Sequence, residues 1–133
     1  GETFHGSGST DILLQTDGRS VFIAECKFWD GPATIGACIE QLLDYATWRD
    51  AKTAILIFNR RKDFSGVLEQ IPGAVAAHPN VKCAVKKMGD TVFRFRVQLR
   101  DDASREMTVT LMVFDVPTDR SVSERLKKPR KQG

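Results

Sequence analysis

Continuous and periodic hydrophobic stretches divide this chain into a series of predicted strands and helices. Residues 10–15 begin with an apolar run and predict a first strand. Residues 21–29 form a nearly unbroken apolar, β-branched and aromatic run, which is typical of a strand covered on both faces. Asp17 and Gly18, between the two runs, are typical of a hairpin turn. We therefore expect an antiparallel hairpin near the start of the chain, preceded by a loop over residues 1–9.

A strand–helix–strand unit is predicted to follow the hairpin. Pro32 or Thr34 is expected to begin a helix that ends near residue 49 or 50 and packs one apolar stripe on the sheet. The apolar run at residues 53–58 predicts a second central strand, parallel to the strand at 21–29. Another helix is predicted from Ser65, as its N-cap, to about residue 77, with a kink or break at Pro72.

The pattern of the second half of the chain predicts an antiparallel meander added to an α/β core. Strands are predicted at residues 81–87, 91–99 and 106–116. Lys82, Lys86, Arg94 and Arg96 alternate with apolar residues there, which indicates either a cationic sheet face or a merely solvated one. We expect one domain over residues 1–117, with its core at about 10–77 and the β extension at about 81–116. Residues 118–133 are expected to form a flexible basic tail.

Composition indicates an ordinary globular domain. The chain has 133 residues, of which 41% are hydrophobic and 28% are charged. It has neither an apolar run of membrane-spanning length nor a signal-peptide pattern, so we expect a cytoplasmic protein that does not enter a membrane. Three cysteines in apolar contexts are expected to be reduced core thiols. The net charge of +3 permits a polyanionic partner without requiring one.

Charged residues inside the apolar run at 21–29 are the main candidates for chemistry. Glu25 and Lys27 are two positions apart and project from one face of the predicted strand, whereas Cys26 projects from the other. Charges in a covered strand are costly unless they are paired or bind a metal. The predicted hairpin would bring Asp11 beside them. Two carboxylates and a lysine could hold a divalent metal and activate a water, or Glu25 and Lys27 could form a structural ion pair.

Two further groups have alternative interpretations. Gln41 and Tyr45 lie on a stripe that adjoins the apolar face of the first predicted helix. From the residues alone, Tyr45 is a boundary packing residue and Gln41 is solvated; the alternative is a donor pair aimed at the carboxylates. A basic cluster follows the strand at 53–58 and could equally bind phosphates or form a solvated turn; it consists of Arg60, Arg61 and Lys62.

The arrangement of Asp11, Glu25 and Lys27 resembles the PD-(D/E)xK nuclease superfamily, which has the restriction-endonuclease-like fold. Gln41 and Tyr45 look like the Q-x-x-x-Y element of its recombination-exonuclease and related branches. The predicted order of hairpin, helix, strand and helix is also similar, over about residues 10–77. Thr10 stands where the motif has proline, and the family's first helix has no counterpart before Asp11. We therefore expect the chain to be part of a longer protein.

The resemblance implies a role for each motif residue. Asp11 and Glu25 would be metal ligands, joined by the main-chain carbonyl of Cys26. Lys27 would position or deprotonate the attacking water and stabilise negative charge on the phosphate. The implied cofactor is Mg²⁺, with Mn²⁺ as a substitute, because hard cations prefer carboxylate and carbonyl oxygens.

The resemblance also implies that Gln41 orients the site or touches substrate and that Tyr45 supports it. The expected activity is metal-dependent hydrolysis of phosphodiester bonds in nucleic acid, DNA rather than RNA, in a restriction-like or defence role. The alternative is a catalytically inactive nuclease-fold module that binds nucleic acid or a partner protein. Paired cuts on duplex DNA would suggest a homodimer. The sequence leaves endo- or exonuclease action and sequence specificity open.

Overall fold

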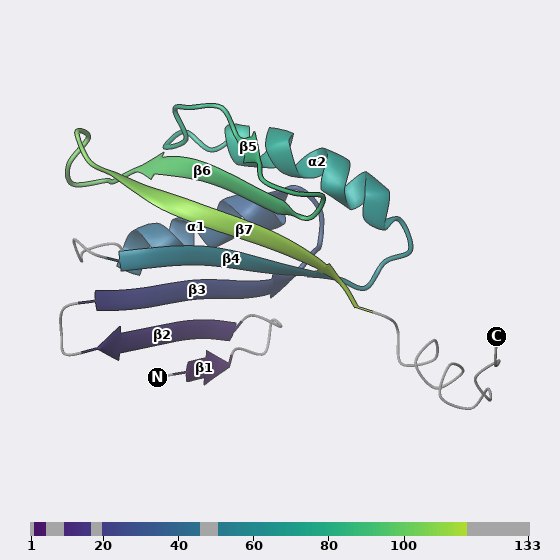
Figure 1. Cartoon of the computed structure of the whole chain (residues 1–133), viewed down its shortest axis with the longest axis horizontal. Coiled ribbons are helices and arrows are strands. Elements are labelled where there is room, and N and C mark those ends of the chain that lie inside the picture. The colour runs from purple at the N-terminus through teal and green to yellow at the C-terminus, as the bar shows by residue number, and fades with distance from the viewer. Residues whose placement is uncertain (1, 5–9, 17–19, 46–50, 117–133) are drawn as a thin grey trace.

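A computed structural model of the chain describes residues 2–4, 10–16, 20–45 and 51–116 (Figure 1). It contains two helices that alternate with the strands of a single sheet. In chain order the elements are β1 (Glu2–Phe4), β2 (Thr10–Thr16), β3 (Ser20–Phe28), α1 (Ala33–Tyr45), β4 (Ala51–Asn59), α2 (Phe64–Ala76), β5 (Lys86–Lys87), β6 (Val92–Gln98) and β7 (Glu106–Asp115). This arrangement confirms the predicted α/β class.

The sheet is mixed, and its strands follow the order β1-β2-β3-β4-β7-β6-β5. The central pairs β3–β4 and β4–β7 are parallel, whereas the pairs β1–β2, β2–β3, β6–β7 and β5–β6 are antiparallel. The predicted strand–helix–strand unit is thus confirmed. The predicted antiparallel pairing of the last strands is confirmed. Their description as an appendage is wrong, because β7 pairs parallel with β4 and so belongs to the centre of the same sheet.

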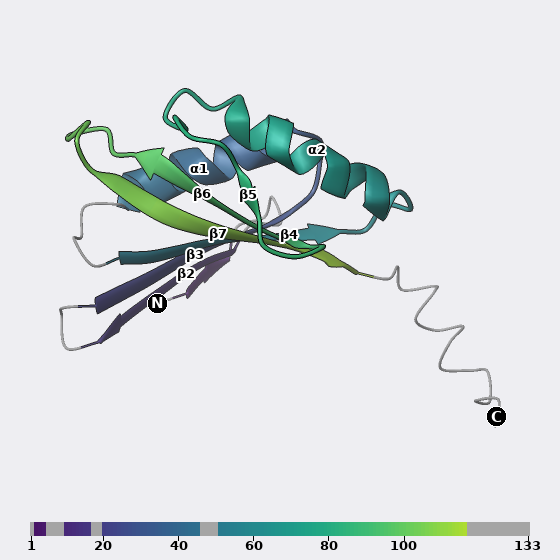
Figure 2. The same cartoon turned by 45° about the horizontal axis from the view of Figure 1, so that its top comes forward.

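One hydrophobic core joins both helices to one face of this sheet. Figure 2 shows α1 and α2 on the same side of the strands. Apolar residues at alternating positions of the central strands lie in this core, together with one stripe of each helix. The fully enclosed members include Ile35, Ile39 and Leu42 of α1, Ile71 and Val75 of α2, Ile55 and Ile57 of β4, and Val97, Val109 and Leu111 of the last strands. Both described helices therefore cover the same face of the sheet.

Two predicted boundaries differ from the structure near the ends of elements, and a third is not described. Glu2–Phe4 pairs antiparallel with β2, where a loop was expected. Asp63, not Ser65, is the N-cap of α2, because its carboxylate accepts a hydrogen bond from the Gly66 amide at 3.0 Å. The predicted end of the first helix lies in residues 46–50, outside the described part of the chain.

Helix α2 continues through Pro72 without a break. Proline removes one hydrogen-bond donor from a helix, yet the buried stripe of Val67, Ile71 and Val75 packs on the core along the whole helix. That packing outweighs the lost hydrogen bond. Neither α1 nor α2 has the length and hydropathy that a helix needs to cross a membrane.

The predicted strand at residues 81–87 is mostly absent. Only Lys86–Lys87 pairs as a strand, and Val81 forms an isolated bridge with Val97. The reason is the turn that ends α2, in which the Val81 amide donates to the His78 carbonyl at 3.1 Å. Because this turn orients Val81 into the core, the chain reaches the edge of the sheet only at Lys86.

Candidate active site

The hairpin of β2 and β3 brings the two acidic candidates together along the backbone. The strands pair Thr10 with Cys26 and Asp11 with Glu25. The prediction that folding places Asp11 beside Glu25 is therefore confirmed for the main chain. The side chain of Asp11 lies outside the described part of the structure.

Glu25 lies inside the fold. It shares a face of β3 with Ile23 and Trp29, which belong to the core beneath the helices, and its side chain is only 2% exposed. Its Oε2 atom is fully enclosed. Lys27 follows on the same face and is half-buried. Cys26 alternates to the other face, with 9% exposure. Because water is largely excluded from Glu25, its ionised form requires stabilisation by a nearby positive charge or by donors.

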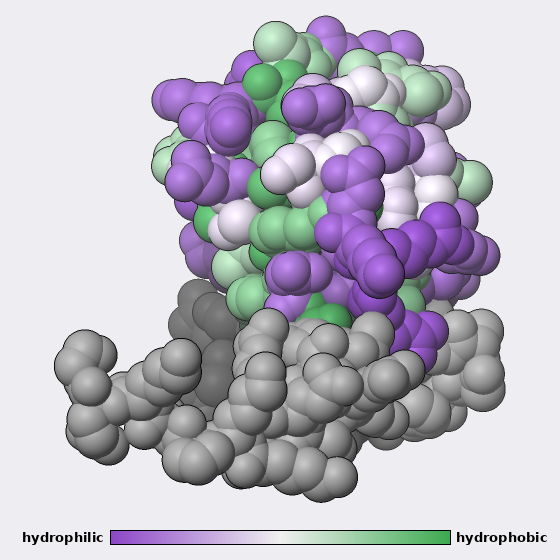
Figure 3. All heavy atoms as spheres, turned by 90° about the vertical axis from the view of Figure 1, so that its right-hand side faces the viewer, coloured by the Kyte–Doolittle hydropathy of each residue, from purple (hydrophilic) through white to green (hydrophobic). Residues whose placement is uncertain are grey.

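Both acidic candidates lie toward the edge of the sheet at which the parallel strands β3, β4 and β7 end. Helices α1 and α2 begin at the same edge, because each follows directly after one of these strands. At the start of α1, the Thr34 hydroxyl accepts a hydrogen bond from the Asp30 amide at 2.8 Å. Helix N-termini carry partial positive charge, which makes this edge favourable for a polyanion. Figure 3 looks onto this side of the molecule and shows hydrophilic residues around a smaller hydrophobic area.

The basic cluster after β4 lies at this edge. Arg60 stacks its guanidinium over the ring of Phe28, 3.8 Å from the ring centre. Arg61 forms an exposed ion pair with Asp30 at 2.6 Å. Lys62 is also exposed. All three cations are therefore accessible, and their predicted contact with phosphate stays a prediction.

Asn59 connects the elements at this edge, and sequence analysis did not select it. Its side chain is 0% exposed and donates both to the Arg61 carbonyl at 2.7 Å and to the Asp115 carboxylate at 3.1 Å. The main-chain carbonyl of Asn59 accepts a hydrogen bond from the Val116 amide. The ends of β4 and β7 and the basic turn are thus held together by one buried amide. An asparagine at the end of an apolar strand would have been the only local signal.

The Q-x-x-x-Y residues differ in their surroundings. Tyr45 is half-buried and packs against the core, which confirms the packing interpretation for this residue. Gln41 is exposed on α1. Its predicted role toward the carboxylates stays a prediction.

The predicted metal site depends on Asp11. Among the side chains that the structure describes, no group of three or more His, Cys, Asp and Glu residues gathers in one place. Glu25 is the one predicted acidic ligand whose side chain is described. Its donor chemistry fits a hard divalent cation, because carboxylate oxygens are what such ions prefer.

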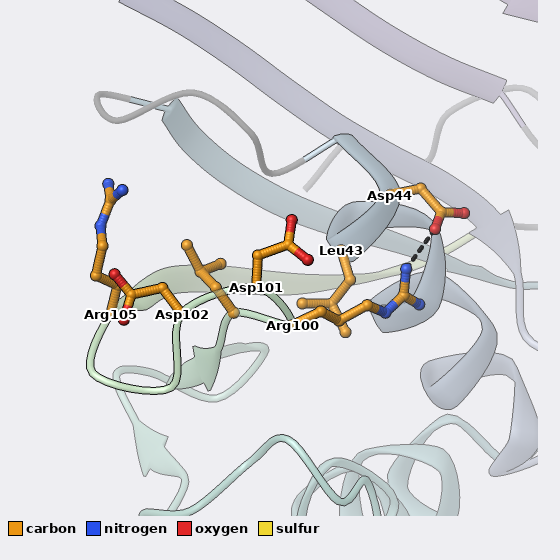
Figure 4. Close-up of a pocket in the computed structure, with 7 residues that line it drawn as sticks. Leu43, Asp44, Arg100, Asp101, Asp102 and Arg105 are labelled. Atoms are coloured by element: carbon orange, nitrogen blue, oxygen red, sulfur yellow. Dashed lines mark hydrogen bonds and ion pairs between the residues drawn. The ribbon is translucent and has the colours of Figure 1, made fainter.

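A separate hollow of about 330 Å³ lies at the opposite end of the sheet, where β6 ends and β7 begins (Figure 4). Leu43, Asp44, Leu99, Arg100 and Asp101 line it together with Asp102 and Arg105. Figure 4 shows Arg100 reaching Asp44 of α1. This hollow contains none of the predicted site residues.

Beside that hollow, a polar cluster connects α1, the end of α2 and the loop after β6. The Oε2 atom of Glu40 lies 2.6 Å from Nε2 of His78, and Oε1 of Glu40 pairs with Arg100. His78 accepts a hydrogen bond at Nδ1 from the Asn80 amide, so its proton lies on Nε2 and is donated to Glu40. His78 therefore has a structural role just after the end of α2. The sequence did not predict the cluster, because its members are far apart along the chain.

The stability of this cluster is expected to depend on pH through Glu40. The hydrogen bond from His78, followed by that from Arg100, lowers the pKa of Glu40 below its ordinary value of 4.5. A lowered folded-state pKa contributes stability above about pH 4.5, and this contribution is lost as the pH falls through the folded-state pKa. We expect Glu40→Gln to unfold in urea with a free energy ~0.5 kcal/mol lower than wild type at pH 7. The difference should shrink at pH 3, and an equal difference at both pH values would contradict the assignment. Glu69→Gln, on the exposed side of α2, is the matched control.

The three cysteines form no disulfide with one another, and Cys26 and Cys38 are buried, whereas Cys83 is half-buried.

Comparison with known proteins adds no identification: no family model, no curated protein and no solved structure matches this chain.

Proposed function

We propose that this protein is a metal-dependent nuclease that hydrolyses phosphodiester bonds of nucleic acid, DNA rather than RNA. One observation carries the proposal: the register of β2 and β3 pairs Asp11 with Glu25, and Lys27 follows two residues later on the same strand. This is the spatial arrangement that the resemblance to the PD-(D/E)xK superfamily requires of these residues.

Electrostatics support a cation between the two strands. Residues directly opposite on antiparallel strands are close neighbours, and like charges at such positions destabilise the pair. Glu25 is in addition almost completely buried. A divalent cation between Asp11 and Glu25 would offset both costs.

Each residue then has a distinct task. Asp11, Glu25 and the Cys26 carbonyl would hold Mg²⁺ or Mn²⁺, which supplies a more acidic bound water and shields phosphate charge. Lys27, half-buried beside Glu25, would place its ammonium against the phosphate oxygens where negative charge develops. Gln41 would orient the substrate from α1, and Tyr45 would hold that helix against the core.

Substrate binding would use the cations at the same edge. Arg60, Arg61 and Lys62 are exposed next to the ends of the parallel strands. Phosphate contacts of this kind position a nucleic acid without reading its sequence. The exposed pair of Arg61 with Asp30 is no obstacle, because such surface pairs are worth at most about 1 kcal/mol.

The test is cleavage of supercoiled plasmid and of single-stranded DNA in Mg²⁺, Mn²⁺ or EDTA. We expect cleavage with either metal and none in EDTA. A second measurement does not depend on activity: Mn²⁺ at saturating concentration should raise the melting temperature by about 3 °C or more, because it binds only the folded state. Glu25→Gln should lose both the cleavage and the metal-dependent shift.

Two results would contradict the proposal. Cleavage that persists in EDTA would exclude the metal-dependent reaction. Absence of cleavage and of any Mn²⁺-dependent shift in a folded wild-type protein would instead favour an inactive nuclease-fold module. A homodimer, which paired cuts would require, is tested by sedimentation of the same samples.

A further inference from the structure

The face of the sheet opposite the helices carries an aromatic row. Phe28, Phe58 and Phe114 are direct partners across the neighbouring strands β3, β4 and β7. The rings of Phe58 and Phe114 stack with centres 5.4 Å apart and an interplanar angle of 21°. The rings of Phe28 and Phe58 are tilted, with centres 6.0 Å apart. Side chains in this row alternate with the core residues of the same strands, so they face away from α1 and α2.

This row is accessible at its β7 end. Phe114 is 41% exposed, one of the largest exposures of a hydrophobic side chain among the described residues. At the β3 end, Arg60 already covers Phe28 as a cation stacked on its ring. The row therefore presents the exposed ring of Phe114 and the positive charge of Arg60 at the edge where the parallel strands end, near Lys27.

Further cations lie on the same face beyond β7. Arg94 pairs with Thr110 of β7 and with Lys86 of β5, which puts all three on the face of Phe114. Arg94, Arg96 and Lys86 line a hollow of about 460 Å³, together with Cys83, Phe95 and Thr108. Glu106 lies beside Arg96, at 3.7 Å, in a loose exposed pair. Thr108, the residue of β7 that lines this hollow, is six residues from Phe114, so it lies about 20 Å along the strand from the aromatic row.

We infer that this face, defined by Phe28, Phe58, Phe114, Arg94 and Arg96, binds a single strand of nucleic acid. Aromatic rings on a sheet offer stacking surfaces for unpaired bases, and surrounding cations attract the phosphates. The positive charge of the face selects a polyanion over an apolar partner such as a second copy of this sheet. A duplex does not fit this combination, because its bases are stacked on one another and cannot reach the rings.

The inference rests on the proposed function for the class of substrate, but it concerns a surface on the other face from Glu25. A strand bound there passes Arg60 and reaches the edge that carries Lys27. The face thus provides a reason for the enzyme to act on unpaired strands or on the frayed ends of duplexes.

The test is fluorescence anisotropy of the whole protein with a labelled oligo(dT) and a labelled duplex of equal length, in EDTA so that no cleavage occurs. We expect the single strand to bind more tightly than the duplex. Phe114→Ala should weaken single-strand binding roughly tenfold, since one stacking contact is lost. Arg94→Ala combined with Arg96→Ala should lower the slope of log affinity against log salt by about 1.4, at ~0.7 per phosphate contact. Glu69→Ala, on α2, is the matched control.

Unchanged single-strand binding by Phe114→Ala, with circular dichroism showing an intact fold, would overturn the inference. So would a wild-type dimer in sedimentation that Phe114→Ala dissociates, because the face would then be covered by a second copy. These results differ from failure of the nuclease proposal. If the wild-type protein binds oligo(dT) through Phe114 but never cleaves DNA, the binding face is supported and the nuclease proposal fails. If the wild-type protein cleaves DNA and Phe114→Ala binds oligo(dT) as tightly as wild type, the nuclease proposal is supported and the binding face fails.

Discussion

Lys27→Met is expected to reduce metal-dependent DNA cleavage by about 100-fold to 1000-fold while leaving the protein folded. The lysine would supply positive charge where negative charge develops on the phosphate, and removing one such group costs a factor of this size. The substitution is expected to spare the fold, because Lys27 is only half-buried on β3 and its charge would act on the phosphate. Initial cleavage rates and thermal melts on the same sample provide the measurement.

Lys52→Met is the matched control for this experiment. Lys52 is an exposed lysine of β4 that pairs with Phe22, near the opposite end of β3 from Lys27. We expect it to cleave DNA like wild type. Equal activity of Lys27→Met and wild type would remove Lys27 from the mechanism. Loss of the fold together with the activity would show that Lys27 forms a structural ion pair instead.

Phe95→Ala is expected to lower the free energy of unfolding by about 3–5 kcal/mol, a large part of the stability of a domain of this size. Phe95 is 2% exposed and lies on β6 within the core that joins the sheet to the helices. Truncation would leave a cavity that the surrounding strands can fill only partly. Urea unfolding followed by circular dichroism measures the effect.

Arg94→Ala is the matched control for Phe95→Ala within β6. Arg94 precedes Phe95 on the same strand but is exposed on the opposite face, so Arg94→Ala should change the free energy of unfolding by no more than ~0.5 kcal/mol. A small loss for Phe95→Ala would mean that the later strands are an appendage outside the core, as the sequence alone suggested. A large loss would agree with the central position of β7 beside β4.

The candidate site was predictable to the extent that it depends on short-range pattern. Glu25 and Lys27 were conspicuous because they interrupt an apolar strand, and their shared face follows from the two-residue period of β structure. The approach of Asp11 followed from the hairpin between β2 and β3, whose register is confirmed. The contribution of Asn59 was not predictable, because its partner Asp115 comes from β7, far along the chain.

By itself, the sequence determined the class of fold and the central hairpin and strand–helix–strand unit. These features depend on hydrophobic periodicity and on local turns, which act over a few residues. Only the tertiary structure decided that β7 pairs parallel with β4, that both helices cover one face, and that a row of phenylalanines lies on the other. These features depend on which apolar surfaces bury one another at long range, and many pairings of the same strands share one local pattern.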